Sequence, residues 1–267
     1  MVSWTWLDDG ASDLVVRRPR ASEPTHRSGR GHHRSPAPVS SIHLTTETEH
    51  PPPTPWPVAD PTAPCLLFGG TFDPPHGAHI ALAAAARDAA LGSDAWLVFV
   101  PAGQNPHKPT GPIASDAQRI EMLRLATAEL ERSAIWTDEV DRAAIEDGPS
   151  YWSLTLDRAR IAAPRATDLR FLIGADQAVA FHRWRDPDEI VRVAEPVVLL
   201  RAPHDTRKKL AAALRGEGRN ESEIRAWMDR VADVGVAEAS STAVRGGDRT
   251  SLNPRVAQYI RRHGLYT

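Results

Sequence analysis

Two histidines and a glycine turn give the strongest chemical signal in this sequence. His76 and His79 stand three residues apart, after the turn Gly69-Gly70 and before an alanine-rich segment. If a helix begins here, residues at this spacing share one face, so both imidazoles point the same way. The free N–H groups and the positive end of the helix dipole point there as well. Such a combination suits phosphate and predicts a nucleotide-binding site.

The histidine pair has two simpler interpretations, a surface or capping pair and a zinc site. The glycine turn upstream disfavours the first. Zinc is disfavoured because no third ligand lies close in the sequence and the glutamate of an HExxH motif is absent. The phosphate interpretation is therefore preferred.

The elements that must position this turn follow an alternating pattern from about residue 63 onward. Apolar strands that alternate with helices pair in parallel and are covered on both faces. We predict an α/β fold, a Rossmann-like doubly wound parallel sheet in a single catalytic domain, with a helical insertion and a disordered N-terminal tail. Ligands bind such sheets at the carboxyl ends of the strands, where the Gly69-Gly70 turn falls. The predicted strands are 66–69, 96–100, 134–137, 169–173, 197–200 and 234–237, and the predicted helices are 77–91, 115–130, 150–162, a short one opened by Asp186-Pro187 and a last one opened by Asn253-Pro254 with Val256, Tyr259 and Ile260 on one face.

Residues 1–62 differ from the rest in composition. They are rich in Pro, Ser, Thr, His and Arg, and no helix or strand period survives there, which predicts a disordered low-complexity tail. The folded domain then covers 63–267. Translation from Val39 or Val58 is an alternative in which the tail is not made in full.

Residues 205–232 read as a helical insertion. Leu210 and Leu214 form one apolar stripe, and a second stripe follows the spacing i, i+3, i+4, i+7. We favour a helical hairpin packed on the domain edge over a lid or a subunit contact. The second stripe consists of Ile224, Trp227, Met228 and Val231, and the breaker between the stripes is 216–220.

Composition excludes several classes of protein. The 267 residues carry a formal net charge of −2, so no basic field exists to hold a nucleic acid. No apolar run approaches the roughly 20 residues that a membrane span needs. A single cysteine, Cys65, permits no disulfide within the chain and fits a reducing cytoplasm. We therefore expect a cytoplasmic protein with neither nucleic acid nor membrane as a partner.

Five ordered segments together resemble one known family, the bacterial nicotinate-nucleotide adenylyltransferases. The resemblance covers about residue 64 to the C-terminus, apart from the insertion. One HxxH motif alone would be weak evidence, whereas five matches in order and in strand–loop contexts are strong. The segments are Gly69–His79, Val100–Lys108, Gly148–Tyr151, Gly174-Ala175-Asp176 followed by Trp184, and Ser240–Arg245 with Tyr259-Ile260 and Leu265-Tyr266 beyond it.

The resemblance implies a reaction and its partners. ATP and nicotinate mononucleotide give nicotinate adenine dinucleotide and pyrophosphate, with Mg²⁺ bound to ATP. The nucleophile is already an anion, so neither a strong base nor a covalent intermediate is expected. The protein must align two anions and absorb charge on pyrophosphate. The resemblance identifies no protein ligand for the metal, and a homo-oligomer is compatible with it.

The resemblance also assigns phosphate-binding residues. His76 and His79 would hold phosphate oxygens, Lys108 would neutralise charge, and Arg245 would act as a charged fork. Asp176 resembles the acid that contacts ribose. The remaining ATP and phosphate residues are Gly70, Thr71, Phe72, Gly174, Ser241 and Thr242. Taken singly, Lys108 and Arg245 could be surface charges, and Asp176, Ser241 and Thr242 could be helix caps.

The nicotinate nucleotide is assigned to a second group of residues. Trp184 resembles the platform for the pyridine ring, with a core position as the alternative. Backbone N–H donors near Trp152 and Arg185 would bind the nicotinate carboxylate, and Tyr151 is assigned to the same site. A carboxylate only accepts hydrogen bonds, so a pocket of N–H groups prefers the acid to the amide.

Two positions depart from the family pattern. Ala78 adds a methyl where the family has glycine and a nucleotide approaches closely. Trp152 stands where threonine is usual, so a side chain that faces the pyridine pocket would change the selectivity between acid and amide. Two alternatives stay open: an HxxH nucleotidyltransferase for nicotinamide mononucleotide or another phosphorylated acceptor, and a non-catalytic nucleotide sensor.

Overall fold

The computed structural model describes residues 50–103, 111–146, 148–235 and 252–266, without the side chains of Ala78 and His79. From Pro52 onward these residues belong to one compact unit. Its centre is the predicted parallel sheet.

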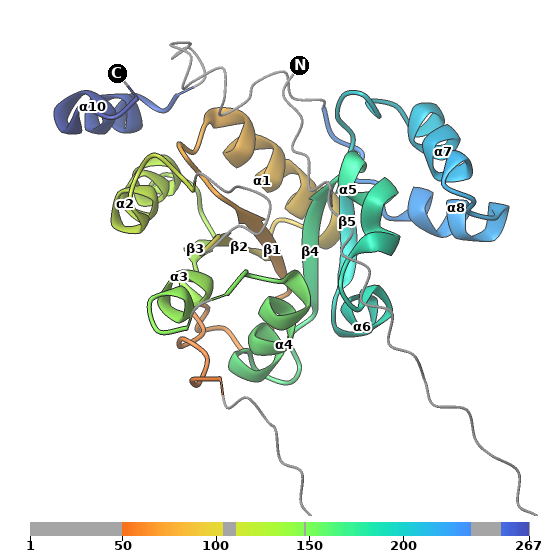
Figure 1. Ribbon diagram of the computed structural model, residues 1–267, viewed down its shortest axis with the longest axis horizontal. Coiled ribbons are helices and arrows are strands. Elements are labelled where there is room, and N and C mark those ends of the chain that lie inside the picture. Colours follow the sequence, from red (N-terminus) through yellow and green to blue (C-terminus); the bar gives the residue numbers. More distant parts are fainter. Residues whose placement is uncertain (1–49, 104–110, 147, 236–251, 267) are drawn as a thin grey trace, which may run out of the picture. The chain divides into compact units, whose positions relative to one another are not determined.

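Within the described residues the sheet has five strands, all parallel, in the order β3-β2-β1-β4-β5 (Figure 1). This order confirms the doubly wound, Rossmann-like fold. The chain runs outward from β1 to β3 and then returns to the other side of β1, so the topological switch point lies between β1 and β4. The strands are β1 (Cys65–Gly70), β2 (Trp96–Pro101), β3 (Ser133–Ile135), β4 (Leu169–Gly174) and β5 (Glu195–Leu199).

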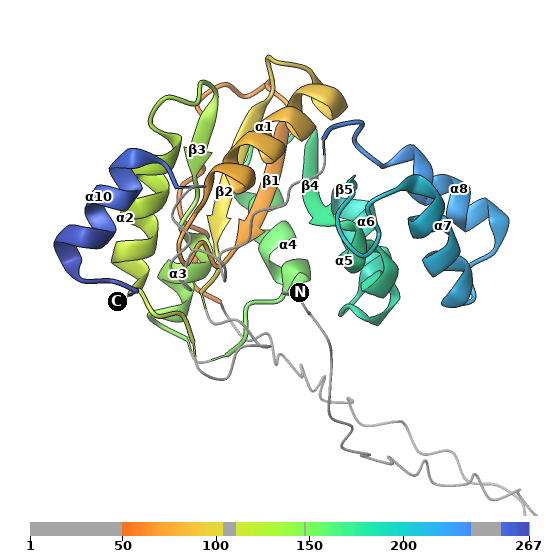
Figure 2. The ribbon, with the colours of Figure 1, turned by 90° about the horizontal axis from the view of Figure 1, so that it is seen from above.

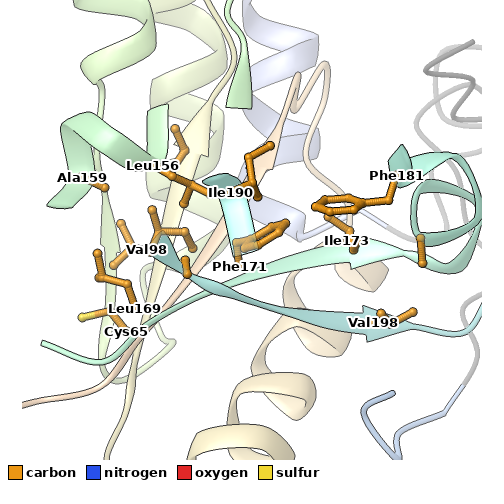
Figure 3. Close-up of a cluster of buried hydrophobic side chains, with 14 of the residues drawn as sticks. Cys65, Val98, Leu156, Ala159, Leu169, Phe171, Ile173, Phe181, Ile190 and Val198 are labelled. Carbon is orange, nitrogen blue, oxygen red and sulfur yellow. The ribbon is translucent and has the colours of Figure 1, made fainter. Parts of the chain in front are cut away.

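Both faces of the sheet are apolar, which is why helices cover both (Figure 2). Successive residues of a strand point to opposite faces. Leu66 and Leu97 pack with α1 (Gly77–Leu91) and α2 (Asp116–Thr127), whereas Leu67 and Val98 pack in the cluster on the other face. Figure 3 shows that second cluster around Phe171 and Val98. This cluster also contains residues of α4 (Trp152–Ala162), α5 (Ala175–Ala180), the 3₁₀ helix η1 (Phe181–Arg183) and α6 (Pro187–Val193).

Local capping explains where several helices begin. Ser115 accepts a hydrogen bond from the N–H of Gln118 at 3.3 Å, and the Gln118 side chain accepts from the N–H of Ser115 at 2.9 Å. This capping box confirms the predicted start of α2. Asn253 caps α10 (Pro254–His263), and Val256, Tyr259 and Ile260 lie on one face as predicted, with Val256 and Ile260 buried and Tyr259 partly buried in the same cluster. Asp186 stands before α6, but its side chain makes no capping bond, so Pro187 rather than a cap marks that start.

One predicted strand is wrong in its described part. Val234 and Gly235 carry no strand, and the rest of 234–237 lies outside the described residues. The chain pairs with β5 earlier, through an isolated parallel bridge between Val198 and Val231. The bridge therefore forms two residues after the end of α8 (Glu221–Asp229), before the predicted strand.

The chain before residue 63 contributes to the packing, which corrects the predicted tail boundary. The ring of Trp56 meets that of Trp136 edge-on at 5.3 Å, and Val58 is buried in the core. Thr54 donates its N–H to Asp138 at 2.8 Å. Residues 1–49 of the predicted tail lie outside the described residues.

The segment 205–232 forms two helices, α7 (Arg207–Gly216) and α8 (Glu221–Asp229). Leu210, Leu214, Ile224 and Trp227 are buried, and Trp227 meets Phe181 edge-on at 5.2 Å. A short helix α3 (Asp138–Ala143) follows β3. Among the described residues, no helix is long and apolar enough to cross a membrane.

Candidate active site

The turn after β1 places His76 before the helix rather than inside it. α1 begins at Gly77, and His76 is its N-cap residue in an extended conformation. The prediction that both histidines share the first helical turn is therefore wrong for His76. The residue is 2% exposed, and burial lowers the pKa of its imidazole to about 4. His76 is thus neutral at pH 7, with one N–H donor and one acceptor nitrogen.

Phe72 gives the turn its shape. It adopts a left-handed conformation with φ of 49°, which is costly for a residue with a Cβ. Its buried ring packs edge-on against Phe68 at 5.6 Å and against Phe99 at 5.9 Å. A Cβ on Gly70 would lie 3.0 Å from the Phe72 ring, so glycine permits this folding-back. The aromatic packing therefore holds the predicted phosphate turn.

Asp73 ties the same turn to the segment before α2, a role that the sequence analysis missed. Its carboxylate accepts the N–H groups of Ile113 at 2.8 Å and Ala114 at 3.1 Å. The hydroxyl of Tyr266 also donates to it. The turn is thus fixed to two segments distant in sequence.

Arg119 is a second residue that the sequence analysis missed. Its side chain is fully buried, and one arm donates to the carbonyl of Thr71 at 2.6 Å. The other arm donates to the carbonyl of Ala102 at 2.6 Å and to Asp116 at 2.7 Å. Arg119 precedes buried Met122 by one helical turn, so a charge on the apolar stripe of α2 was the available signal.

Asp176 lies at the same sheet edge, beyond β4. Its carboxylate is 3.5 Å from the guanidinium of Arg201, which follows β5. Burial lowers the pKa of Arg201, and the charge of Asp176 opposes that shift. A Cβ on Gly174 would lie 2.5 Å from Asp176 Oδ1 and 2.8 Å from Arg201 Cδ, so glycine allows the pair to close over the strand end. Arg201 was missed, although an arginine directly after an apolar strand is a recognisable signal.

The switch point between β1 and β4 is lined by aromatic rings. Pairing of the two strands ends at Leu67 and Phe171, although both strands continue. The ring of Trp152 lies beyond that pair, edge-on to Phe171 at 6.0 Å, and a Cβ on Gly69 would lie 2.9 Å from it. The Trp152 ring therefore packs on the sheet at the carboxyl end of β1, next to the switch point where doubly wound folds bind ligands.

Trp184 joins the same aromatic group. Its ring is 6.5 Å from Phe171 and 5.0 Å from Phe181, and it is half-buried. The guanidinium of Arg185 lies 5.1 Å from the centre of the Tyr151 ring, and both side chains are exposed. The structure thus brings the four predicted pyridine-site residues to one region around Phe171.

Known proteins with similar sequences share this whole domain. The cytidylyltransferase-like family model matches residues 67–247. A probable nicotinate-nucleotide adenylyltransferase of Neisseria meningitidis serogroup C is 36% identical over 204 residues, which cover 75% of this chain and 96% of that protein. A relative of the same name in Chromobacterium violaceum is 34% identical, with 75% and 97% covered. This chain belongs to the nicotinate-nucleotide adenylyltransferase family.

A solved structure supports the same fold for this member of the family. The Plasmodium falciparum nicotinic acid mononucleotide adenylyltransferase complexed with NaAD superimposes with a TM-score of 0.54 at 14% identity. The superposition covers 76% of this chain and 97% of that one.

Several family residues predicted from the sequence lie outside the described residues: Lys108, Ser241, Thr242 and Arg245. His79 lies in the first turn of α1, but its side chain is not described. Their roles stay predictions. The described part of the site consists of the β1 turn, the Asp176–Arg201 pair and the aromatic group.

Proposed function

We propose that the chain transfers the adenylyl group of ATP to nicotinate mononucleotide, giving nicotinate adenine dinucleotide and pyrophosphate, a step of NAD biosynthesis. The observation that carries the proposal is that the β1 turn and the β4–α5 junction at Gly174–Asp176 follow neighbouring strands at the switch point. Relatives named for this activity match the chain over nearly their whole length.

The phosphate side of the site would act by alignment rather than by base catalysis. The mononucleotide phosphate is an anion at pH 7 and attacks the α-phosphorus of ATP in line. His76 would donate its single N–H to a phosphate oxygen, beside the backbone N–H groups of Thr71 and Phe72. His79, Lys108 and Arg245 would stabilise charge on the transferred group and on pyrophosphate. Ser241 and Thr242 would bind the β- and γ-phosphates.

The nucleoside side would rely on Asp176 and the aromatic group. Asp176, beside Gly174, would accept hydrogen bonds from ribose hydroxyls, with Arg201 orienting its carboxylate at 3.5 Å. Trp184 would support the pyridine ring. Tyr151, Trp152 and Arg185 would line the position of its carboxyl group, and the positive charge of Arg185 favours the acid over the neutral amide.

Mg²⁺ would accompany ATP. The described residues contain no group of three side chains that could hold a metal. Of the carboxylates at the site, Asp73 is engaged by two N–H groups and Asp176 faces Arg201. This donor set suits a metal held by phosphate oxygens and water, which is how Mg²⁺ often binds beside nucleotides. When bound it would neutralise phosphate charge. We propose a cytoplasmic location from the single buried cysteine, and self-association stays a prediction.

Pyrophosphate release tests the proposal directly. The purified chain is supplied with ATP, Mg²⁺ and either nicotinate mononucleotide or nicotinamide mononucleotide. Strong preference for the acid is expected. Equal or reversed preference would move the assignment to another acceptor, and ATP binding without any release would indicate a nucleotide sensor.

Two variants extend the test. His79→Ala should lose most turnover and keep the fold, because the expected contact is with charge at the α-phosphorus; near-normal turnover would contradict that assignment. Trp152→Thr restores the usual family residue. It should change the ratio of acid to amide turnover while leaving the KM for ATP nearly constant, since the Trp152 ring lies at the switch point.

A further inference from the structure

One peptide group beyond β2 is held from both sides by buried side chains. The carbonyl of Ala102 accepts a hydrogen bond from Arg119 Nη2 at 2.6 Å. The N–H of Gly103, the other end of the same peptide group, donates to Glu139 Oε2 at 3.4 Å. Arg119 comes from α2 and Glu139 from α3, so two helices determine the orientation of this peptide.

Gly103 makes the close approach possible. A Cβ at this position would lie 2.4 Å from the backbone oxygen of Glu139 and 2.9 Å from the Cβ of Ala143. The chain leaving β2 therefore lies directly against the backbone of α3, where no side chain fits.

Each of the two side chains has a second arm that reaches another part of the site. Arg119 Nη1 donates to the carbonyl of Thr71, in the β1 turn, at 2.6 Å. Glu139 Oε1 accepts from the hydroxyl of Thr155 at 2.6 Å. The N–H of Thr155 in turn donates to the carbonyl of Tyr151, the N-cap of α4, at 3.1 Å.

The contacts form an unbroken polar line inside the protein. Arg119 and Thr155 are fully buried, and Glu139 is 4% exposed. Burial raises the pKa of Glu139, while the hydrogen bonds from Thr155 and Gly103 and the charge of Arg142 oppose that shift. Buried polar groups that lose one partner are not rescued by water, so such a network holds as a unit or fails as a unit.

We propose that Arg119 and Glu139 are positioning residues that join the exits of β1 and β2 to the start of α4 through the Ala102–Gly103 peptide. The β1 turn lies on the phosphate side, and Tyr151 and Trp152 lie on the nicotinate side. The line therefore holds the two substrates' binding elements at one separation. A shift of about 1 Å between reacting groups can lower turnover by about 100-fold.

A residue that only stabilises the fold should affect the melting temperature but not turnover. Asp138 is the matched control for this distinction. It neighbours Glu139 on α3 and is 1% exposed. Its carboxylate binds Arg158 at 2.6 and 2.8 Å and the N–H of Thr54, which lead away from the β1 turn. Asp138→Asn should lower the melting temperature and leave kcat/KM within about twofold of the original, since its partner Arg158 lies six residues beyond Trp152 on α4 and its partner Thr54 is no part of the line.

The experiment compares Glu139→Gln, Thr155→Val and the double variant with Asp138→Asn. An amide at 139 loses one acceptor oxygen, so we expect kcat/KM for nicotinate mononucleotide to fall by about tenfold or more. The double variant should lose no more than the worse single one, because both break the same line. Thr155→Ser retains the hydroxyl and should restore most activity.

Two outcomes would overturn the inference: a change in kcat/KM no larger than that of Asp138→Asn, or additive losses in the double variant. If Glu139→Gln does not fold, Thr155→Val against Thr155→Ser carries the test. The inference rests on the proposed function. If the unaltered chain shows no turnover with either mononucleotide, that function fails separately. The dissociation constant for ATP with Mg²⁺ then tests the line: a rise in Thr155→Val that is reversed in Thr155→Ser supports it, and equal constants overturn it.

Discussion

The segments that follow the strands, called here the strand exits, are held differently on the two sides of the switch point. Beyond β1 and β2, Arg119 and Glu139 are buried and bind backbone groups. Beyond β4 and β5, Asp176 and Arg201 meet side chain to side chain at 3.5 Å, with 21% and 26% of those side chains exposed. The first pair is held by hydrogen bonds to the backbone, whereas the second is a longer contact between two partly exposed side chains.

We expect this difference to separate the alignment of the reacting atoms from the binding of the rest of the substrate. The β1 and β2 exits carry the segments assigned to phosphates, where reacting atoms must be aligned closely. The segments after β4 and β5 carry Asp176, which we propose as the ribose contact, away from the reacting phosphates. Four predictions test this comparison, from the largest expected effect to the smallest.

Removing the buried guanidinium should have the largest effect. Arg119→Met removes the buried guanidinium that donates to the carbonyls of Thr71 and Ala102. We expect a loss of about 3–5 kcal/mol in the free energy of unfolding, measured by urea denaturation. A loss below about 1 kcal/mol would show that water reaches these carbonyls and that the exits are not held rigidly.

His76 should make stability depend on pH. Its pKa of about 4 in the folded state lies below the ordinary 6.5, so between these values the unfolded chain binds more protons. Stability therefore falls as the pH drops from 6.5 to 4, by about 3 kcal/mol from this residue. Urea denaturation across that window should show a shallower decline in His76→Gln. Parallel curves for both proteins would contradict the buried neutral histidine.

The same glycine-to-alanine substitution can be made on both sides of the switch point, at Gly103 and at Gly174. A Cβ on Gly103 would meet the backbone oxygen of Glu139 at 2.4 Å, and one on Gly174 would meet Asp176 Oδ1 at 2.5 Å. Backbone cannot yield, whereas the ends of Asp176 and Arg201 can rotate away. Gly103→Ala should cost about 1–3 kcal/mol and Gly174→Ala distinctly less. Equal melting temperatures for the two variants would remove the contrast.

Breaking the partly exposed Asp176–Arg201 pair should have the smallest effect on stability. Arg201→Gln removes an ion pair that solvent screens, so we expect a change below about 1 kcal/mol in urea denaturation. A loss as large as that of Arg119→Met would mean that both strand exits are held alike.

The parallel sheet, its strand–helix alternation and the candidate turns could be predicted because their signals are local. Apolar runs mark the buried strands, and the Ser115–Gln118 pair marks the start of α2. The failures have non-local causes. The helix 77–91 was predicted with its correct start, but the spacing of the two histidines does not show that His76 is the extended N-cap residue before the first turn. The segment around Trp56 was assigned to a tail because its partner Trp136 lies 80 residues further on.

The amino-acid sequence by itself determined the family, the strands that meet at the binding edge and the residue types that suit phosphate and a pyridine ring. The family and the pyridine-site residues follow from the resemblance of five ordered segments, and the strands and the phosphate turn follow from composition and period along the chain. Only the tertiary structure decided which groups hold that edge together. Arg119, Glu139 and Arg201 meet their partners across different elements, and neither burial nor a partner's distance is written in local spacing. The same physical cause, the exclusion of water by packing, also makes His76 neutral and places Trp152 over Gly69.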